Sequence, residues 1–230
     1  MRVLGIETST EARSVALVED GRLKGEFFFL GEGRHSEHLM EELDLLLRSL
    51  GLPPSKIDGV AVTIGPGSFT GLRVGLSIAK GLAFAAGIPI LGIGTLDALT
   101  ACAHFWTGMI CPIVDARNQR VYGALYRVIS GQKEPLEKEG LRDLKSWIRN
   151  FWGPVLFIGD ASVKYREVIE DSLGDIARFA PVELSHPRAS VVARLGWERL
   201  KKGESDDLER LVPLYLQESQ AEKELRKRLA

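Results

Sequence analysis

The sequence predicts an α/β protein of two lobes, each with a mixed β-sheet flanked by helices. Short apolar stretches alternate with amphipathic ones along the 230 residues, which is typical of α/β folds. The order strand–strand–strand–helix–strand–helix opens the chain, and most of it occurs again from about residue 108. We therefore expect an N-terminal lobe over residues 1–107 and a C-terminal lobe over residues 108–216. A final helix over 217–230 is expected to pack back on the first lobe.

The first three elements are predicted to be antiparallel strands. RVLGIE (2–7) is short and apolar, ARSVALVED (12–20) alternates apolar and polar residues, and RLKGEFFFL (22–30) follows as its partner. Asp20-Gly21 between the last two is a hairpin turn signal.

A helix and a buried strand are expected next. The helix is capped by Ser36 and ends at Gly51 and Pro53. VAVTI (60–64) is continuously apolar, as in a strand covered on both faces. The helix carries an apolar stripe at helical spacing: Leu39, Leu43, Leu46, Leu47 and Leu50.

A second helix is predicted from about Thr70 to Ala86. Glycine inside a helix costs about 1 kcal/mol relative to alanine, so tight packing should offset the loss. PILGIG (89–94) is then a strand, and TLDALTACAHF (95–105) is a helix opened by Thr95. Small residues lie four apart on one face of the second helix and let another backbone approach closely: Gly71, Gly75, Ala79 and Ala83.

The second half repeats this alternation. An apolar strand that begins at Met109 ends in an acidic residue and a polar turn. Strands are predicted at 121–128, 133–140 and 155–160, and a short extended segment at 212–216. Helices are predicted at 141–151, 161–173 and 190–203, and again from about Glu218.

The composition excludes several classes of protein. A net charge of −1 argues against a chain that grips nucleic acid alone, since such proteins carry a basic face. Cys102 and Cys111 belong to no CxxC pair and are expected to be reduced thiols. We find no signal peptide and no charge-free apolar run of 18 residues, which predicts a cytoplasmic protein without a membrane segment.

The glycine-rich stretch GPGSFTGLR (65–73) fits neither common phosphate loop. Its glycines are spaced one residue too far apart for G-x-G-x-x-G, and no acidic residue follows at the position that would hold a ribose. It lacks the lysine of a P-loop, and Pro66 removes a backbone donor. The pattern favours a sharp turn after a strand, with Ser68 or Thr70 capping the next helix. A partner surface and a ligand loop are the alternatives.

The sequence shows no independent catalytic apparatus. His35 and His38 share a helix face, but a metal site there would need a third ligand. No G-x-S-x-G elbow occurs, and His104 and Cys102 make a poor dyad on a helix. We therefore expect neither a metal site nor a nucleophilic triad, and a protease finds no support.

Several motifs together resemble one family. RVLGIETS at the start is followed in order by RHSEHL (34–39), GPGSFTGLRVGLSIAKGLA (65–83), DARNQRVY (115–122) and VPLYL (212–216). This set spans nearly the whole chain and resembles the TsaB family, also called YeaZ. The resemblance implies the two-lobed fold of actin, sugar kinases and Hsp70 ATPases (the ASKHA fold). It also implies a role in making threonylcarbamoyladenosine at position 37 of tRNAs that read codons starting with A.

The same resemblance implies partners. In the family, the protein is a non-catalytic partner of TsaD, which transfers the threonylcarbamoyl group, and the ATPase TsaE joins the pair. We therefore expect a heterodimer with TsaD, tRNA contact only through the complex, and no cofactor. A homodimer of the chain alone and weak ATP or ADP binding in the complex stay open. The alternative function is an ATP-binding, kinase-like enzyme of the same superfamily.

The first two predicted helices of the first lobe are the candidate partner surface. If part of their apolar surface is not covered by the chain's own sheet, it must meet another protein. Two helices from each partner would form a four-helix interface, the form that the TsaB–TsaD contact has in the family. The candidate interface residues are His35, Ser36, Glu37, Leu39, Leu43, Leu46, Phe69, Arg73, Gly71, Gly75 and Ala79.

The resemblance also implies where a nucleotide cleft would lie. In the superfamily, a loop after the first strand of each lobe holds phosphates, and a glycine turn holds the adenosine. Here Glu7 replaces an aspartate and Asp160 replaces a second glycine, so we expect a vestigial or weak cleft. For Asp115 and Arg117, an ion pair across the lobe boundary is the alternative. The cleft residues are Glu7, Thr8, Ser9, Asp115, Arg117, Gly159 and Asp160.

Overall fold

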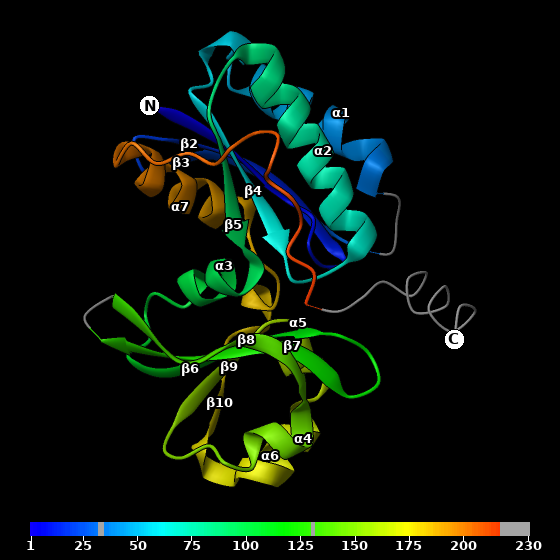
Figure 1. Ribbon diagram of the computed structural model, residues 1–230, viewed down its shortest axis with the longest axis vertical. Helices are drawn as coiled ribbons and strands as arrows, with labels where there is room; N and C mark the ends of the chain where they lie inside the picture. The colour runs from blue at the N-terminus through cyan, green and yellow to red at the C-terminus, as the bar shows by residue number, and fades with distance from the viewer. Residues whose placement is uncertain (32–34, 130–131, 217–230) are drawn as a thin grey trace.

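The computed structural model describes residues 1–31, 35–129 and 132–216, which form two lobes stacked one above the other (Figure 1). Within these residues each lobe holds a five-stranded sheet, in the order β3-β2-β1-β4-β5 in the first and β10-β9-β6-β7-β8 in the second. In each sheet three successive strands pair antiparallel and the remaining ones pair parallel. The predicted class, two lobes with mixed sheets, is confirmed.

The five strands of the first sheet lie where the sequence predicts them. The Asp20-Gly21 turn joins β2 to β3, and both residues have positive φ (49° and 77°), as a tight hairpin turn requires. The strands are β1 (Arg2–Glu7), β2 (Ala12–Glu19), β3 (Arg22–Leu30), β4 (Gly59–Gly65) and β5 (Ile90–Gly94).

One face of the first sheet is covered by α1 (His35–Ser49) and α2 (Phe69–Ala86), which lie side by side (Figure 1). The leucine stripe of α1 enters the core of the lobe. Helix α1 begins one residue before the expected cap, Ser36. Ser68 rather than Thr70 caps α2, because its hydroxyl accepts the N–H of the third residue of the helix at 3.2 Å.

The opposite face is covered by α7 (Ala189–Lys201). Small residues bring α7 close to the sheet: a Cβ on Gly5 would lie 2.2 Å from a carbonyl oxygen of α7, and one on Gly196 would lie 2.5 Å from the Cβ of Ala61. The expected end of the second lobe at residue 216 is therefore wrong. Residues 189–216 pack on the first lobe, although they follow the second lobe in the sequence.

Residues 204–216 form a strap along the edge of the first sheet. Asp206 bonds to the backbone of β5 through both its amide and its carboxylate, and the carboxylate also pairs with Arg199 (Nη2–Oδ1 3.1 Å). The amide of Leu214 donates to the carbonyl of Ile64 at 2.7 Å. The predicted extended segment thus crosses the end of β4, and the helix expected over 217–230 lies outside the described residues.

The second lobe differs from expectation in three places. The helix expected over 141–151 is shorter because β8 continues to Asp143, whose side chain caps it. The helix expected over 161–173 is interrupted at Tyr165. A three-residue strand, β10 (Ala177–Phe179), was not predicted and adds to the edge of the sheet.

The other elements of the second half, with the bounds that the structure gives them, complete the fold. The strands are β6 (Gly108–Asp115), β7 (Arg120–Ile129), β8 (Gln132–Asp143) and β9 (Val155–Ile158). The helices are α3 (Thr95–Cys102), which packs on both lobes, α4 (Leu144–Ile148), α5 (Asp160–Lys164) and α6 (Arg166–Leu173). Short 3-10 turns lie at Pro54–Lys56, Gly174–Ile176 and Val182–Leu184.

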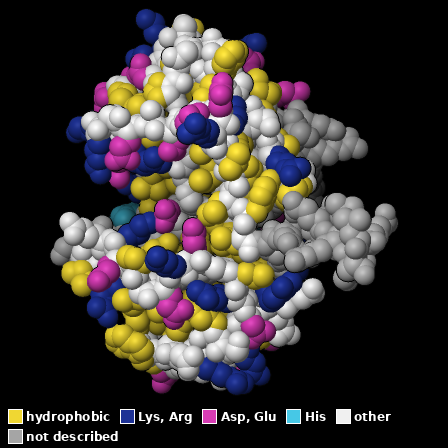
Figure 2. Space-filling model, viewed as in Figure 1, with side chains coloured by type: hydrophobic (Ala, Val, Ile, Leu, Met, Phe, Trp, Pro, Cys, Tyr) yellow, Lys and Arg dark blue, Asp and Glu magenta, His cyan; other side chains and the backbone are white. Residues whose placement is uncertain are grey.

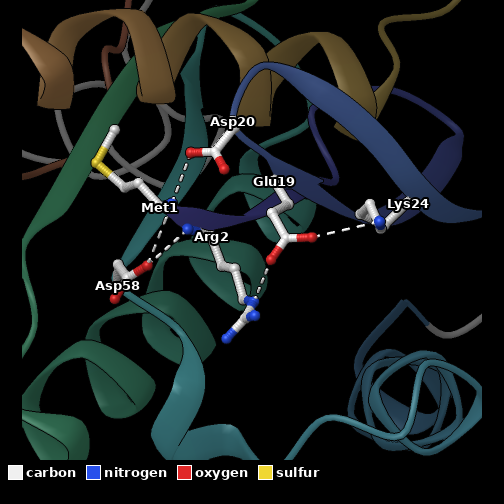
Figure 3. A network of polar contacts seen from close by, with 6 residues as sticks. All are labelled: Met1, Arg2, Glu19, Asp20, Lys24 and Asp58. Carbon is white, nitrogen blue, oxygen red and sulfur yellow. Dashed lines mark hydrogen bonds and ion pairs between the residues drawn. The ribbon is translucent and has the colours of Figure 1, made fainter.

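A polar network fixes the start of β1 (Figure 3). The N-terminal amine of Met1 donates to Asp20 Oδ1 at 2.7 Å, and the Arg2 side chain pairs with Glu19 at the same distance. Lys24 approaches the second carboxylate oxygen of Glu19 at 3.3 Å. These contacts tie β1 to the β2–β3 hairpin at the end of the strand opposite Glu7.

Candidate functional site

The loop after β1 is enclosed by the start of α2. Glu7, Thr8 and Ser9 are all fully buried. The Thr8 hydroxyl donates to the carbonyl of Gly71 at 2.7 Å, and the amide of Ser68 donates to the carbonyl of Ser9 at 2.7 Å. The polar groups of this predicted phosphate loop are thus bonded to the chain itself.

Glycines make the enclosure possible. An added Cβ at Gly67 would lie 2.1 Å from the carbonyl oxygen of Ser9, and one at Gly71 would lie 2.0 Å from that of Thr8. One at Gly75 would lie 2.2 Å from the Thr8 hydroxyl oxygen. All three distances are far inside van der Waals contact, so no larger residue fits. The stretch GPGSFTGLR is a turn and a packing face, as the sequence favours. The backbone that packs closely against it is that of Thr8 and Ser9 in the same chain.

Glu7 is the titratable group of this loop. Its Oε1 accepts hydrogen bonds from the amide and the hydroxyl of Ser9, both at 2.6 Å, while Oε2 has no partner among the described residues. Burial raises the pKa of the Glu7 carboxyl to about 7, and the bonds from Ser9 together with the nearby Thr63 hydroxyl only partly oppose this. Below pH 7 most of the carboxyl is therefore neutral.

The second predicted loop, after β6, is held from within its own lobe. Lys164 and Tyr165 donate to the carboxylate of Asp115 at 2.5 and 2.7 Å. Burial raises the pKa of Asp115, but these two bonds, with the Arg117 amide and the charge of Lys164, outweigh it and leave the pKa below its ordinary value. The ion pair suggested between Asp115 and Arg117 is wrong: the Arg117 side chain is exposed, and only its backbone amide donates to Asp115, at 3.0 Å.

The predicted adenosine turn is also filled by the chain. A Cβ on Gly159, whose φ is +115°, would lie 2.0 Å from the carbonyl oxygen of Ile113. Asp160 accepts the amides of Asp115 and Ala161 at 3.1 and 2.8 Å. Burial raises the pKa of Asp160 to about 6, and these two bonds oppose the rise. Gly159 and Asp160 thus bind the backbone of β6 to the start of α5.

A partly buried polar network that sequence reasoning missed joins the first lobe to the returning chain. Glu26 on β3 accepts the amide and the hydroxyl of Ser190, both at 2.9 Å, and pairs with Arg188 at 2.9 Å. Nearby, the Thr10 hydroxyl lies 3.2 Å from Nδ1 of the buried His186. None of these residues stands in a motif, so only the contact between distant segments identifies them.

Most of the expected partner interface is wrong, because the inner faces of α1 and α2 are covered by the chain's own sheet. Phe69 and Arg73 are exposed. The side chains of His35, Ser36 and Glu37 lie outside the described part of the chain. Six of the expected residues are buried: Leu39, Leu43, Leu46, Gly71, Gly75 and Ala79.

The outward faces of the same two helices carry apolar side chains that the sequence stripe did not indicate. Met40 and Leu45 on α1 are 47% and 53% exposed, and Phe69 and Phe84 on α2 are 37% and 78% exposed. We call these four residues the α1–α2 outer face. Hydrophobic side chains also gather over α2 and the strap in Figure 2.

The strap ends in a small cluster on α2. The guanidinium of Arg73 lies 3.7 Å from the centroid of the Phe69 ring, and its Nε donates to the Tyr215 hydroxyl at 2.9 Å. The end of the described chain is thus fixed beside the α1–α2 outer face.

Comparisons with known proteins agree with this architecture. A family model described as TsaD: tRNA N6-adenosine threonylcarbamoyltransferase matches residues 31–225. The tRNA threonylcarbamoyladenosine biosynthesis protein TsaB of Bacillus subtilis (strain 168) is 33% identical over 225 residues, which are 96% of each chain. The chain belongs to the TsaB family.

Solved structures support both the family and the wider fold. YeaZ from Pseudomonas aeruginosa matches this TsaB-family chain with a TM-score of 0.78 at 26% identity, covering 94% of this chain and 99% of that one. A ROK hexokinase from Thermus thermophilus matches with a TM-score of 0.50 at 13% identity, covering 86% and 99%. The second likeness shows the fold alone, and it confirms the two-lobed fold that TsaB proteins are expected to share with sugar kinases.

No candidate metal site is present in the part of the TsaB-family chain that the structure describes, since no three His, Cys, Asp or Glu side chains gather there suitably. A groove of about 800 Å³ lies beside β10, lined by residues that include Arg166, Phe179 and Val182. It contains none of the residues predicted for a nucleotide cleft.

Alanine at Gly71 is expected to lower the free energy of unfolding by about 1–3 kcal/mol, because the new methyl group overlaps the carbonyl of Thr8. Gly81 of the same helix is the matched control, since nothing lies within 4 Å of its added Cβ. Gly81→Ala should raise the free energy of unfolding by up to about 1 kcal/mol. Urea unfolding followed by circular dichroism measures both, and equal effects would contradict the packing role of Gly71.

The raised pKa of Asp160 predicts a pH-dependent stability. The unfolded carboxyl ionises near 3.8 and the folded one near 6, so stability falls as pH rises between these values and levels off above them. Asparagine keeps an acceptor without a charge. Asp160→Asn should therefore be more stable than the natural chain at pH 7, by at most about 3 kcal/mol, and should lose this advantage near pH 4. A difference that stays constant in unfolding experiments from pH 4 to pH 7 would refute this.

Proposed function

We propose that this chain is a non-catalytic subunit of the complex that makes tRNA threonylcarbamoyladenosine, and that it pairs with TsaD, the subunit that transfers the threonylcarbamoyl group. Membership of the TsaB family supports the pathway. The closed loop after β1 supports the non-catalytic role, and the α1–α2 outer face supports the pairing.

The observation that carries the non-catalytic role is the enclosure of Glu7, Thr8 and Ser9. A loop that holds phosphate needs amides and hydroxyls that face the ligand. Here the Ser9 amide and hydroxyl donate to Glu7, and the Thr8 hydroxyl donates to α2. These contacts favour a structural use of the loop over the alternative function, an ATP-dependent kinase.

The α1–α2 outer face is the surface that we assign to TsaD. The family model that matches this chain is the model of TsaD itself, so the partner shares this architecture over the matched region. Two related lobes that meet through the same helix pair would bring four helices together around their exposed apolar side chains. The inner faces, bound to the sheet, would hold each pair of helices in place.

For TsaE and tRNA, the proposal follows what the resemblance to the TsaB family implies. TsaE joins TsaD and this chain in a ternary complex, and tRNA is contacted only through the assembly, in line with the net charge of −1. Without TsaD, the same apolar face would pair with a second copy of the chain. The subunit needs no cofactor and works in the cytoplasm.

Charged substitutions on the α1–α2 outer face test the pairing. Leu45→Asp and Phe84→Asp should leave the free chain folded, because both side chains are more than half exposed. Each should weaken association with purified TsaD at least about tenfold, by placing an unpaired charge in an apolar contact. Val182→Asp on the second lobe, where Val182 is 61% exposed, is the matched control and should bind normally. Natural affinity in both outer-face variants, measured by titration calorimetry, would exclude this face.

Reconstitution separates a subunit from an enzyme. TsaD and TsaE with tRNA and the required small substrates should yield modified tRNA only when this chain is added. The chain alone should neither hydrolyse ATP nor bind it saturably in the micromolar range. Nucleoside analysis of the tRNA and calorimetry with ATP measure these outcomes. Tight ATP binding together with turnover by the isolated chain would favour the kinase alternative.

A further inference from the structure

We infer that Glu7 is a proton-linked latch: as a neutral acid it holds α2 on the loop after β1, and it loses its proton when that contact opens. This inference concerns the chain alone and does not depend on its pairing with TsaD. It rests on two buried oxygen atoms that have no partner and on the bonds that connect Glu7 to α2.

The two unpartnered atoms lie on neighbouring strands. Glu7 ends β1, and Thr63 lies on β4, one step beyond the paired residues Ile6 and Val62. The Oε2 atom of Glu7 and the Oγ1 atom of Thr63 are buried and have no hydrogen-bond partner among the described residues. Two such atoms in one core are costly unless they satisfy each other.

A proton on Glu7 Oε2 removes the charge that this buried, unpartnered atom would otherwise carry. Oε1 already accepts two bonds from Ser9, so the proton belongs on Oε2. If Glu7 were ionised and Thr63 donated to it, the bond would form but a charge would be buried without a cation. Burial of an uncompensated carboxylate costs more than burial of the neutral acid.

In the part of the chain that the structure describes, no cation pairs with that carboxylate. Across the described residues, Cys102 on α3 lies close enough to feel the charge of Glu7, and its thiol stays neutral because burial raises its pKa to about 11. Arg188, beyond Cys102, is paired with Glu26. The residue opposite Glu7 on β2 is Ser14, which is uncharged. The neutral form of the Glu7 carboxyl is therefore more stable in this core than the ionised form.

Short bonds connect Glu7 to α2. Ser9 donates twice to Glu7, and its carbonyl accepts the amide of Ser68, the cap of α2. Thr8, between the two, donates to Gly71. Lifting α2 from the loop therefore exposes Glu7 to water, where the carboxyl returns to its ordinary acidity and ionises. Opening of α2 and loss of one proton are one event.

Hydrogen exchange tests this linkage on the isolated chain. After correction for intrinsic exchange rates, the amides in the first half of α2 should lose protection close to tenfold per pH unit from about pH 5 to 6.5, and level off above about pH 7. In Glu7→Gln, which mimics the neutral acid, the protection should not change with pH. Glu42→Gln is the matched control, a buried glutamate that is ion-paired to Arg13, and should keep the slope of the natural chain. The same slope in Glu7→Gln as in the natural chain would overturn the inference.

A direct titration keeps the test decisive if Glu7→Gln does not fold. The carboxyl ¹³C resonance of Glu7 should titrate with a midpoint near 7 in the natural chain. A midpoint below 5 would show that the latch is an ionised carboxylate and would refute the proposal.

Discussion

The close approach of α2 to the loop after β1 is the constraint on which the first lobe depends. Gly71 and Gly75 have no side chain, so the backbone of α2 can lie directly against Thr8. The Thr8 hydroxyl donates to the carbonyl of Gly71 across this contact. Each glycine costs about 1 kcal/mol in an isolated helix, a loss that is offset only when the backbone contact forms. The glycines of α2 are therefore favourable only when the helix packs against this loop.

The position of α2 also determines which hydrogen-bond donors of the loop after β1 are free to bind a ligand. In a two-lobed fold of this kind, the ends of the first strands of the lobes face the junction, where a nucleotide would lie. In this chain, Ser9 and Thr8 direct their donors to Glu7 and α2, and Asp115 is held by Lys164. Groups in the expected places therefore serve the fold. The junction is strengthened further by Glu26 and Arg188, which bind the returning chain to β3.

The sequence reveals the elements because their signals are local, and it misses contacts between distant residues. Alternation and apolar stripes predict the strands and both helices of the first lobe. The glycine stripe correctly indicates a close approach but cannot say to which backbone, since Thr8 is 63 positions from Gly71. The sequence of α7 fits either sheet, and chain order alone predicts that it belongs to the second lobe. Glu26 and Arg188, 162 positions apart, form no motif, and β10 is too short to show a period.

In the proposed complex, the fixed inner faces of α1 and α2 would favour binding through their outer faces. Exposed side chains such as Leu45 and Phe84 would bind a partner well only if the helices beneath them did not shift, because ordering a mobile surface would consume part of the binding energy. The glycine contact supplies that rigidity, and the strap adds to it where Tyr215 bonds to Arg73. The same contact encloses the loop after β1. Under the proposed function, the closed loop and a rigid docking face are therefore two results of one packing arrangement, and a variant that reopened the loop would at the same time loosen the surface.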